Sequence, residues 1–189
     1  MRKNWTVLLT VLLATALPVI AYLLPRNVDE DSLGLVLRVT GRIALLIYLL
    51  IFVARPLRQL VVSPASAWLL KNRRHLGISF ATVMSVHLVL LIMLNGIPLA
   101  IPGIAAYALM YLMLITSFDG PAAALGPRRW RLLHKTGLYV IGAILVVVTA
   151  GDLIATPGDP LRIAIALLLL AAIVVRVAAY LKRRAAKPA

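Results

Sequence analysis

The stretch Lys71–Leu94, KNRRHLGISFATVMSVHLVLLIML, opens with basic residues and continues as an apolar run long enough to cross a bilayer. His87 lies deep inside this run, where hydrocarbon offers an imidazole no water to bond. A histidine at that depth therefore marks a candidate functional site. A second segment, Trp130–Gly137, places His134 just before another long apolar run. Together with His75, these residues are all 3 histidines of the chain.

The composition of the 189-residue chain is typical of a polytopic membrane protein. Hydrophobic residues make up 62% of it, against roughly half in soluble domains, and they occur in runs of about 20. The absence of cysteine excludes disulfides, thiolate catalysis, iron–sulfur ligation and Cys-based zinc sites. The net charge of +14 comes from Lys and Arg between the apolar runs, which indicates membrane topology and contact with anionic lipid, not nucleic acid binding.

The apolar runs predict an all-α membrane bundle of six transmembrane helices in a single domain, residues 1–189. The spans are expected at about 5–24, 33–54, 75–94, 99–115, 136–154 and 160–181. A signal peptide is the alternative for the first run, but its length and the five runs that follow favour an uncleaved span. Between the spans we expect an amphipathic interfacial segment at 61–70, a turn at 95–98 and a loop at 116–135.

Charged residues predict the orientation of this bundle. The loops on the side of both termini hold nearly all of the Lys and Arg, whereas the opposite loops hold Arg26 and five of the six carboxylates. The positive-inside rule therefore predicts a multi-pass protein with both termini in the cytoplasm.

The sequence contains few of the residues and motifs on which enzymes of the soluble kind depend. There is no P-loop or dinucleotide-binding fingerprint, and the apolar spans hold almost no carboxylates for a proton relay. Histidines on apolar helices suit b-type heme, whose iron takes neutral imidazole as an axial ligand.

Four arginines fall within the spans. Arg42 is a candidate partner of heme propionates or a quinone head group, and so is Arg38, which is on the same helical face. Arg38 is nearer the outer end and has snorkelling as an almost equal alternative. We expect Arg162 and Arg176, near span ends, to snorkel.

Three stretches resemble the ferric reductase-like transmembrane family, particularly the heme-binding membrane subunits of bacterial periplasmic methionine sulfoxide reductase systems. They are TGRIALLIYLLIFVARPLRQL (40–60), RRHLGISFATVMSVHL (73–88) and ITSFDGPAAALGPRRWRLLHKTGLYV (115–140). They lie in the predicted spans two to five, and the resemblance implies a heme-binding core at about 33–155 in a protein of the bacterial inner membrane. The resemblance implies that His87 and His134 bind heme iron. It further implies an electron-transfer subunit of an oxidoreductase, with a quinol or a flavin (FMN) reductase as donor and a periplasmic oxidoreductase as acceptor.

One position departs from the family pattern and bears on the number of hemes. The family usually has another histidine where this chain has Val147, and valine cannot ligate iron. His75 and His87 are about 18 Å apart along a regular helix, whereas His75 and His134 are both expected at the cytoplasmic starts of their spans. This shared depth favours one heme per chain, with His75 and His134 as its axial ligands. Val147 also supports the alternative of a cofactor-free membrane scaffold or small transporter with the same fold.

Overall fold

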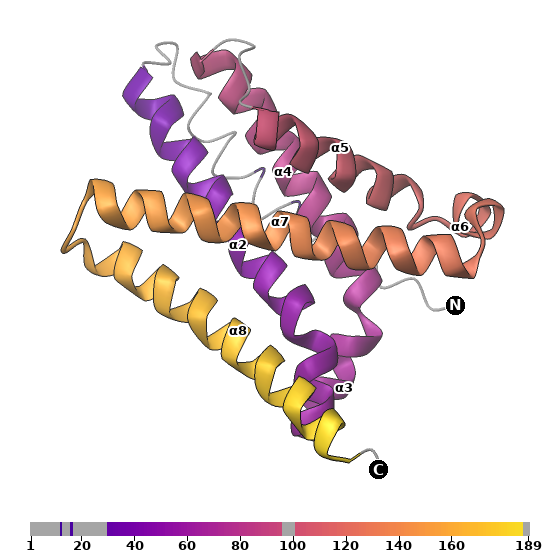
Figure 1. Ribbon diagram of the computed structural model, residues 1–189. Helices are drawn as coiled ribbons and strands as arrows, with labels where there is room; N and C mark the ends of the chain where they lie inside the picture. The colour runs from indigo at the N-terminus through magenta and orange to yellow at the C-terminus, as the bar shows by residue number, and fades with distance from the viewer. Residues whose placement is uncertain (1–11, 13–15, 17–29, 96–100, 187–189) are drawn as a thin grey trace. The chain divides into compact units, whose positions relative to one another are not determined.

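The structure is a computed structural model that describes residues 30–95 and 101–186, together with the isolated positions 12 and 16. The described residues form seven helices and no strands (Figure 1), which confirms the all-α prediction for this part of the chain. Apart from positions 12 and 16, the predicted first span at 5–24 lies outside the described residues, as does the predicted turn beyond Asn95. The helices are α2 (Glu30–Leu60), α3 (Pro64–Lys71), α4 (Arg73–Asn95), α5 (Ile101–Ile115), α6 (Asp119–Leu125), α7 (Pro127–Ala155) and α8 (Pro160–Ala185).

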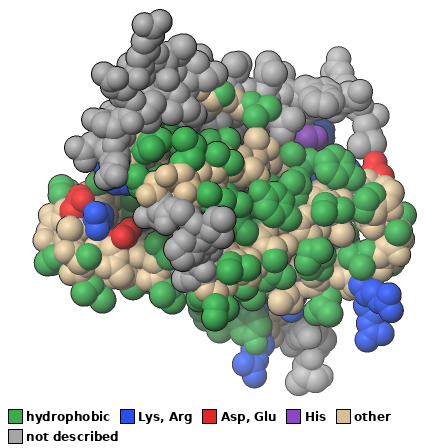
Figure 2. Space-filling model, turned by 90° about the horizontal axis from the view of Figure 1, so that it is seen from above, with side chains coloured by type: hydrophobic (Ala, Val, Ile, Leu, Met, Phe, Trp, Pro, Cys, Tyr) green, Lys and Arg blue, Asp and Glu red, His purple; other side chains and the backbone are tan. Residues whose placement is uncertain are grey.

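Four of these helices, α2, α4, α7 and α8, are long and apolar enough to cross a membrane. The helix α5 has 15 residues and is about 22 Å long, which is short of the roughly 30 Å hydrocarbon core. It is followed by α6 at a bend of 104°, and the two would form a fifth span if they act as one broken segment. Hydrophobic side chains cover much of the face seen in Figure 2, as contact with lipid requires.

Proline and capping residues fix where several helices begin. Pro64, Pro127 and Pro160 each stand in the first turn of a helix, where a missing N–H leaves no hydrogen bond unmade. Before Pro127, Gly126 has a φ of 78°, a left-handed conformation that glycine adopts without strain. Ahead of Pro160, the Asp159 side chain accepts a hydrogen bond from the Leu161 N–H at 2.9 Å.

The predicted loop at 116–135 is wrong. The helix α6 occupies residues Asp119–Leu125, and α7 begins at Pro127, nine residues before the predicted start of the fifth span. His134 is consequently the eighth residue of α7, about two turns inside the helix and not at its edge. His75, in contrast, is the third residue of α4. The two histidines therefore differ in their distance from the starts of their helices.

The helix α2 continues past its predicted end at residue 54, through Pro56 to Leu60. Proline has no N–H, so residue 56 cannot donate to the carbonyl of Phe52, four residues earlier. Arg176 of α8 donates to it instead, since its NH1 atom lies 2.8 Å from the Phe52 carbonyl oxygen. The prediction that Arg176 snorkels is therefore wrong. The guanidinium stays within the protein and replaces the hydrogen bond that Pro56 removes.

The chain divides into two compact units that share α2. The first unit comprises residues 1–48 and 74–124, and so contains the first half of α2 with α4, α5 and α6. In its core the rings of Tyr48 and Phe80 lie 5.9 Å apart. The second unit comprises residues 49–73 and 125–189. It holds the end of α2, the short helix α3, and the antiparallel pair of α7 and α8, which pack against each other (Figure 1).

Candidate functional site

His87 lies in the first unit, on the side of α4 that faces α2. Its Nδ1 atom lies 3.0 Å from the hydroxyl oxygen of Thr40, a residue that is 1% exposed. Next along α2, Gly41 leaves room for the ring, since a Cβ there would come within 3.2 Å of His87 Cε1. Thr40 thus contacts one ring nitrogen of His87, and Gly41 allows the ring to pack closely against α2. These two residues were not singled out in the sequence, although they form the Thr-Gly pair directly before Arg42.

The hydrogen bonds of Thr40 indicate which nitrogen of His87 carries the proton. The Thr40 hydroxyl lies 3.0 Å from the carbonyl oxygens of Val36 and of Leu37, which can only accept. If its single proton is donated to one of them, its oxygen faces the ring as an acceptor and Nδ1 of His87 donates. In this tautomer Nε2 bears the lone pair, which is the form that binds a metal.

Hydrogen bonds connect α4 to α5 close to His87. The hydroxyl of Tyr111 donates to Ser85 at 3.0 Å, and Ser85 in turn donates to the Ala81 carbonyl at 2.8 Å. Ser85 stands two residues before His87.

At the start of α4, Arg74 forms an ion pair of 2.7 Å with Asp119 of α6. Both partners are partly exposed, so this pair contributes at most about 1 kcal/mol.

His75 stands near the start of α4, also in the first unit. Its Nδ1 atom is buried, and among the described residues no hydrogen-bond partner for it is present. The hydroxyl of Ser79, one turn along α4 and on the same face, is buried in the same way. Buried polar atoms without partners in the protein are rare, because each loses its hydration without compensation. His75 and Ser79 thus form a buried polar pair on one face of α4.

His134 belongs to the second unit. Its ring stacks on that of Trp130, one turn earlier on α7, with centroids 4.2 Å apart and an angle of 27° between planes. Trp130 therefore fixes the ring orientation from one side. That His134 binds heme iron stays a prediction.

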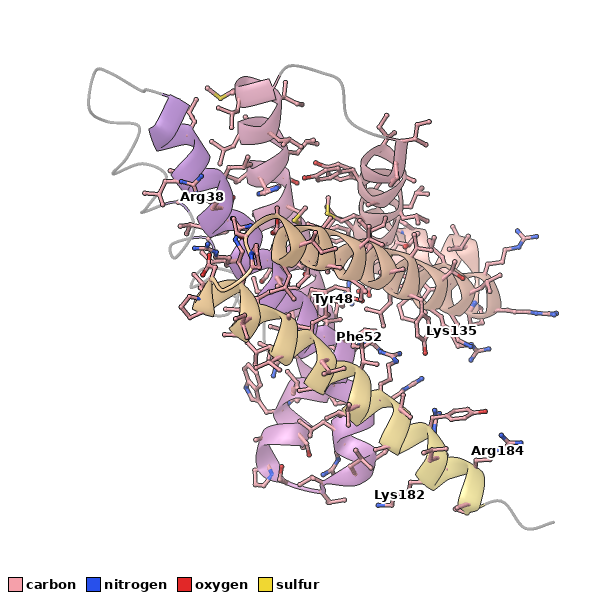
Figure 3. All side chains as sticks on the ribbon, turned by 60° about the vertical axis from the view of Figure 1, so that its left-hand side comes forward. Arg38, Tyr48, Phe52, Lys135, Lys182 and Arg184 are labelled. Carbon is pink, nitrogen blue, oxygen red and sulfur yellow. The ribbon has the colours of Figure 1, made fainter. Side chains whose placement is uncertain are left out.

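The two arginines of the first half of α2 differ in their exposure. The Arg38 side chain is exposed and turns back along the helix, so that its NH1 atom would meet a Cβ at Gly34 at 3.4 Å (Figure 3). It therefore reaches toward the N-terminal end of α2, as a snorkelling side chain does. Arg42, one turn further on, is half-buried. Arg42 remains the better candidate for a buried anionic group such as a propionate.

Two other predictions concern α7 and α8. Val147, where the resembling family has a histidine, is 71% exposed and packs against little of the described protein. Arg162 does not simply snorkel, since its guanidinium lies 3.2 Å from Asp159 and donates to the Asp152 carbonyl at 2.9 Å. Within the described part of the chain there is no group of three or more His, Asp or Glu side chains that could hold a metal ion. Heme iron does not need such a group, because one or two imidazoles are sufficient.

No protein-family model, no curated protein and no solved structure matches this chain.

Proposed function

We propose that this chain is an integral membrane protein that binds b-type heme and passes electrons from a quinol or flavin donor to a partner oxidoreductase. We further propose six spans with both termini in the cytoplasm, in the bacterial inner membrane, and one heme per chain. His75, His87 and His134 are the candidate axial ligands, and Arg42 is the candidate partner of a propionate.

The observation that carries this proposal is the setting of His87. Here the Thr40 hydroxyl contacts Nδ1 of the ring, and Gly41 has no side chain that would clash with the ring. This is the usual arrangement of a ligating imidazole, which donates one N–H to the protein and presents its other nitrogen to iron.

The residues of the chain have distinct tasks in this proposal. When bound, heme supplies a one-electron carrier, and the protein supplies its ligands, burial and charge. Thr40 orients the imidazole of His87, and Arg42 offsets negative charge inside the apolar bundle. The apolar side chains of α2 and α4 exclude water from the site. No residue of the chain needs to act as an acid, base or nucleophile, which suits an electron-transfer subunit and not a complete enzyme.

A reduced-minus-oxidised absorption spectrum of the purified full-length protein, produced with ample heme supply, tests this function. We expect the bands of a low-spin b-type heme and about one heme per chain by pyridine hemochromogen assay. Protein that is folded by circular dichroism and yet contains no heme would exclude the electron-transfer function. That result would favour the cofactor-free scaffold or transporter.

Reporter fusions test the proposed topology. We expect fusions after Leu70, after Leu125 and at Ala189 to report the cytoplasm, and a fusion after Asp159 to report the outside, because Lys and Arg gather on the first side. An outside signal after Leu70 would contradict the six-span arrangement.

A further inference from the structure

The short helix α3 and the residues just before it expose large apolar side chains. Trp68 of α3 is 51% exposed, and Val61 and Val62, between α2 and α3, are 52% and 79% exposed. Three such side chains within eight residues are more than the occasional apolar residue of an ordinary surface. Their exposure therefore indicates a surface that contacts something other than water.

The connections of α3 place it at a membrane surface. It has 8 residues and is about 12 Å long, so it cannot cross a hydrocarbon core of about 30 Å. It joins the end of α2 to the start of α4 (Figure 1), and both of these helices are long and apolar enough to span. A segment between two spans lies where hydrocarbon meets water, which is where tryptophan is enriched in membrane proteins.

Helical spacing separates the side of α3 that packs against the protein from the sides that do not. Ser66 and Leu69, three residues apart, are 1% and 6% exposed, so this side is covered by the protein. Ala65 and Trp68 are also three residues apart, and both are exposed. We call the side with Ala65 and Trp68 the tryptophan side.

A third side of α3 suits water. Ala67 and Lys71 share it, since they are four residues apart, and both are exposed. At about 100° per residue, Ala67 points about 160° away from Ala65. Lys71 is in the last turn of α3, where its charged end can reach water while its stem lies along the helix. The two exposed alanines thus mark opposite sides of one short helix.

The backbone at both ends of α3 is hydrogen-bonded within the protein. Ser63 accepts a hydrogen bond from the Ser66 N–H at 3.2 Å, and the Ser63 N–H donates to the Ser66 hydroxyl at 3.1 Å. That hydroxyl donates to the Val61 carbonyl at 2.8 Å. At the other end, the Asn72 amide donates to the Trp68 carbonyl at 2.9 Å. Helix ends otherwise leave such groups to water, so these bonds suit a helix that lies partly in lipid.

We propose that α3 is an interfacial helix whose tryptophan side lies among the lipid head groups of the bilayer that α2 and α4 cross. Such helices bury their apolar side about 5–10 Å into the boundary between head groups and acyl chains. Lipid is the occupant that the connections favour, because both ends of α3 continue into spans and the bilayer is therefore beside it. The sequence predicts an interfacial segment at 61–70 without indicating which side of it meets lipid. This contact is independent of heme.

Spin labels on the two alanines test the proposal. The chain has no cysteine, so full-length Ala65→Cys and Ala67→Cys variants each carry one label. In phosphatidylcholine vesicles, power-saturation EPR compares collisions with oxygen, which concentrates in bilayers, and with a nickel chelate, which stays in water. We expect the ratio of oxygen to nickel accessibility to be severalfold higher at Ala65→Cys than at Ala67→Cys. Val147→Cys, at a position that is 71% exposed on α7, gives the reference value for lipid.

Brominated lipids test Trp68 itself. The emission of wild type minus that of Trp68→Phe isolates Trp68 from the other two tryptophans, Trp5 and Trp130. We expect this component to be quenched severalfold more strongly by lipid brominated near the head group than by lipid brominated near the end of the acyl chain.

The proposal fails on any of three results. Low ratios at both labelled alanines would show that α3 stands clear of the membrane in water. Labels at both positions that are shielded from oxygen and from nickel alike would show that a protein covers this surface, either a second copy or a partner. Stronger quenching of Trp68 by the deeper bromines would place α3 within the hydrocarbon and not at its boundary.

Discussion

We expect His87→Ala to remove the b-type heme spectrum from the purified protein. The ring of His87 is held through Nδ1 by Thr40, and alanine offers iron no ligand in its place. Heme content by pyridine hemochromogen assay should fall to near zero, while circular dichroism should still show a folded helical protein. His75→Ala and His134→Ala, measured in the same way, identify the second axial ligand, because the variant that loses the low-spin spectrum marks the partner of His87.

A pair of variants at Thr40 separates ligation by His87 from a packing role. Thr40→Val keeps the shape of the side chain and removes the hydroxyl, so we expect heme affinity to fall about 10- to 100-fold. Thr40→Ser keeps the hydroxyl and should restore most of the affinity. Imidazole ¹⁵N chemical shifts of the heme-free protein add an independent readout, in which Nδ1 should be protonated in wild type and the tautomers mixed in Thr40→Val.

The opposite outcome at these positions is also informative. If His87→Ala keeps its heme while His75→Ala and His134→Ala each lose it, then His87 is a core histidine. The depth argument from the sequence, which pairs His75 with His134, would then hold despite the position of His134 inside α7. Equal heme affinities for Thr40→Val and wild type would show that the Thr40 contact only fills space.

The sequence predicts the apolar helices well and their ends less well. The third span, expected at 75–94, matches α4 closely, since its apolar run is bounded by a basic cluster and by Asn95. The start of α7 was missed because Arg128, Arg129 and Arg131 make the first turns polar, and polarity alone resembles a loop. Pro127 after a glycine was the signal for a helix start there.

The candidate site was predicted only in part, for a physical reason. The histidines were identifiable, because imidazole inside an apolar run is unusual in any context. The contact of Thr40 with His87 joins residues 47 positions apart, and nothing in a single sequence indicates which face of α2 turns toward α4. The role of Arg176 could not be predicted for the same reason, since the carbonyl to which it donates belongs to a helix more than a hundred residues earlier.

Replacing Arg176 by methionine is expected to destabilise the protein by about 2–4 kcal/mol. Methionine keeps the apolar stem and removes the hydrogen bond that Arg176 donates to the Phe52 carbonyl, at a cost of about 1–3 kcal/mol. The two cation–π contacts with Phe52 and Tyr139 add about 0.5–2 kcal/mol. Unfolding in mixed micelles with increasing dodecyl sulfate, followed by circular dichroism, measures the change.

Pro56→Ala should relieve most of the carbonyl part of this loss, because the new N–H at position 56 can donate to Phe52 within α2. A double-mutant cycle of Pro56→Ala with Arg176→Met should therefore show a coupling free energy of about 1–3 kcal/mol. Lys182→Met is the matched control, because it removes a cation from the Gln59 carbonyl, which no proline affects. Its effect should add to that of Pro56→Ala without coupling. Additive behaviour of Arg176→Met with Pro56→Ala would show that Arg176 stabilises the second unit only through its aromatic contacts, and not by replacing the hydrogen bond that Pro56 removes.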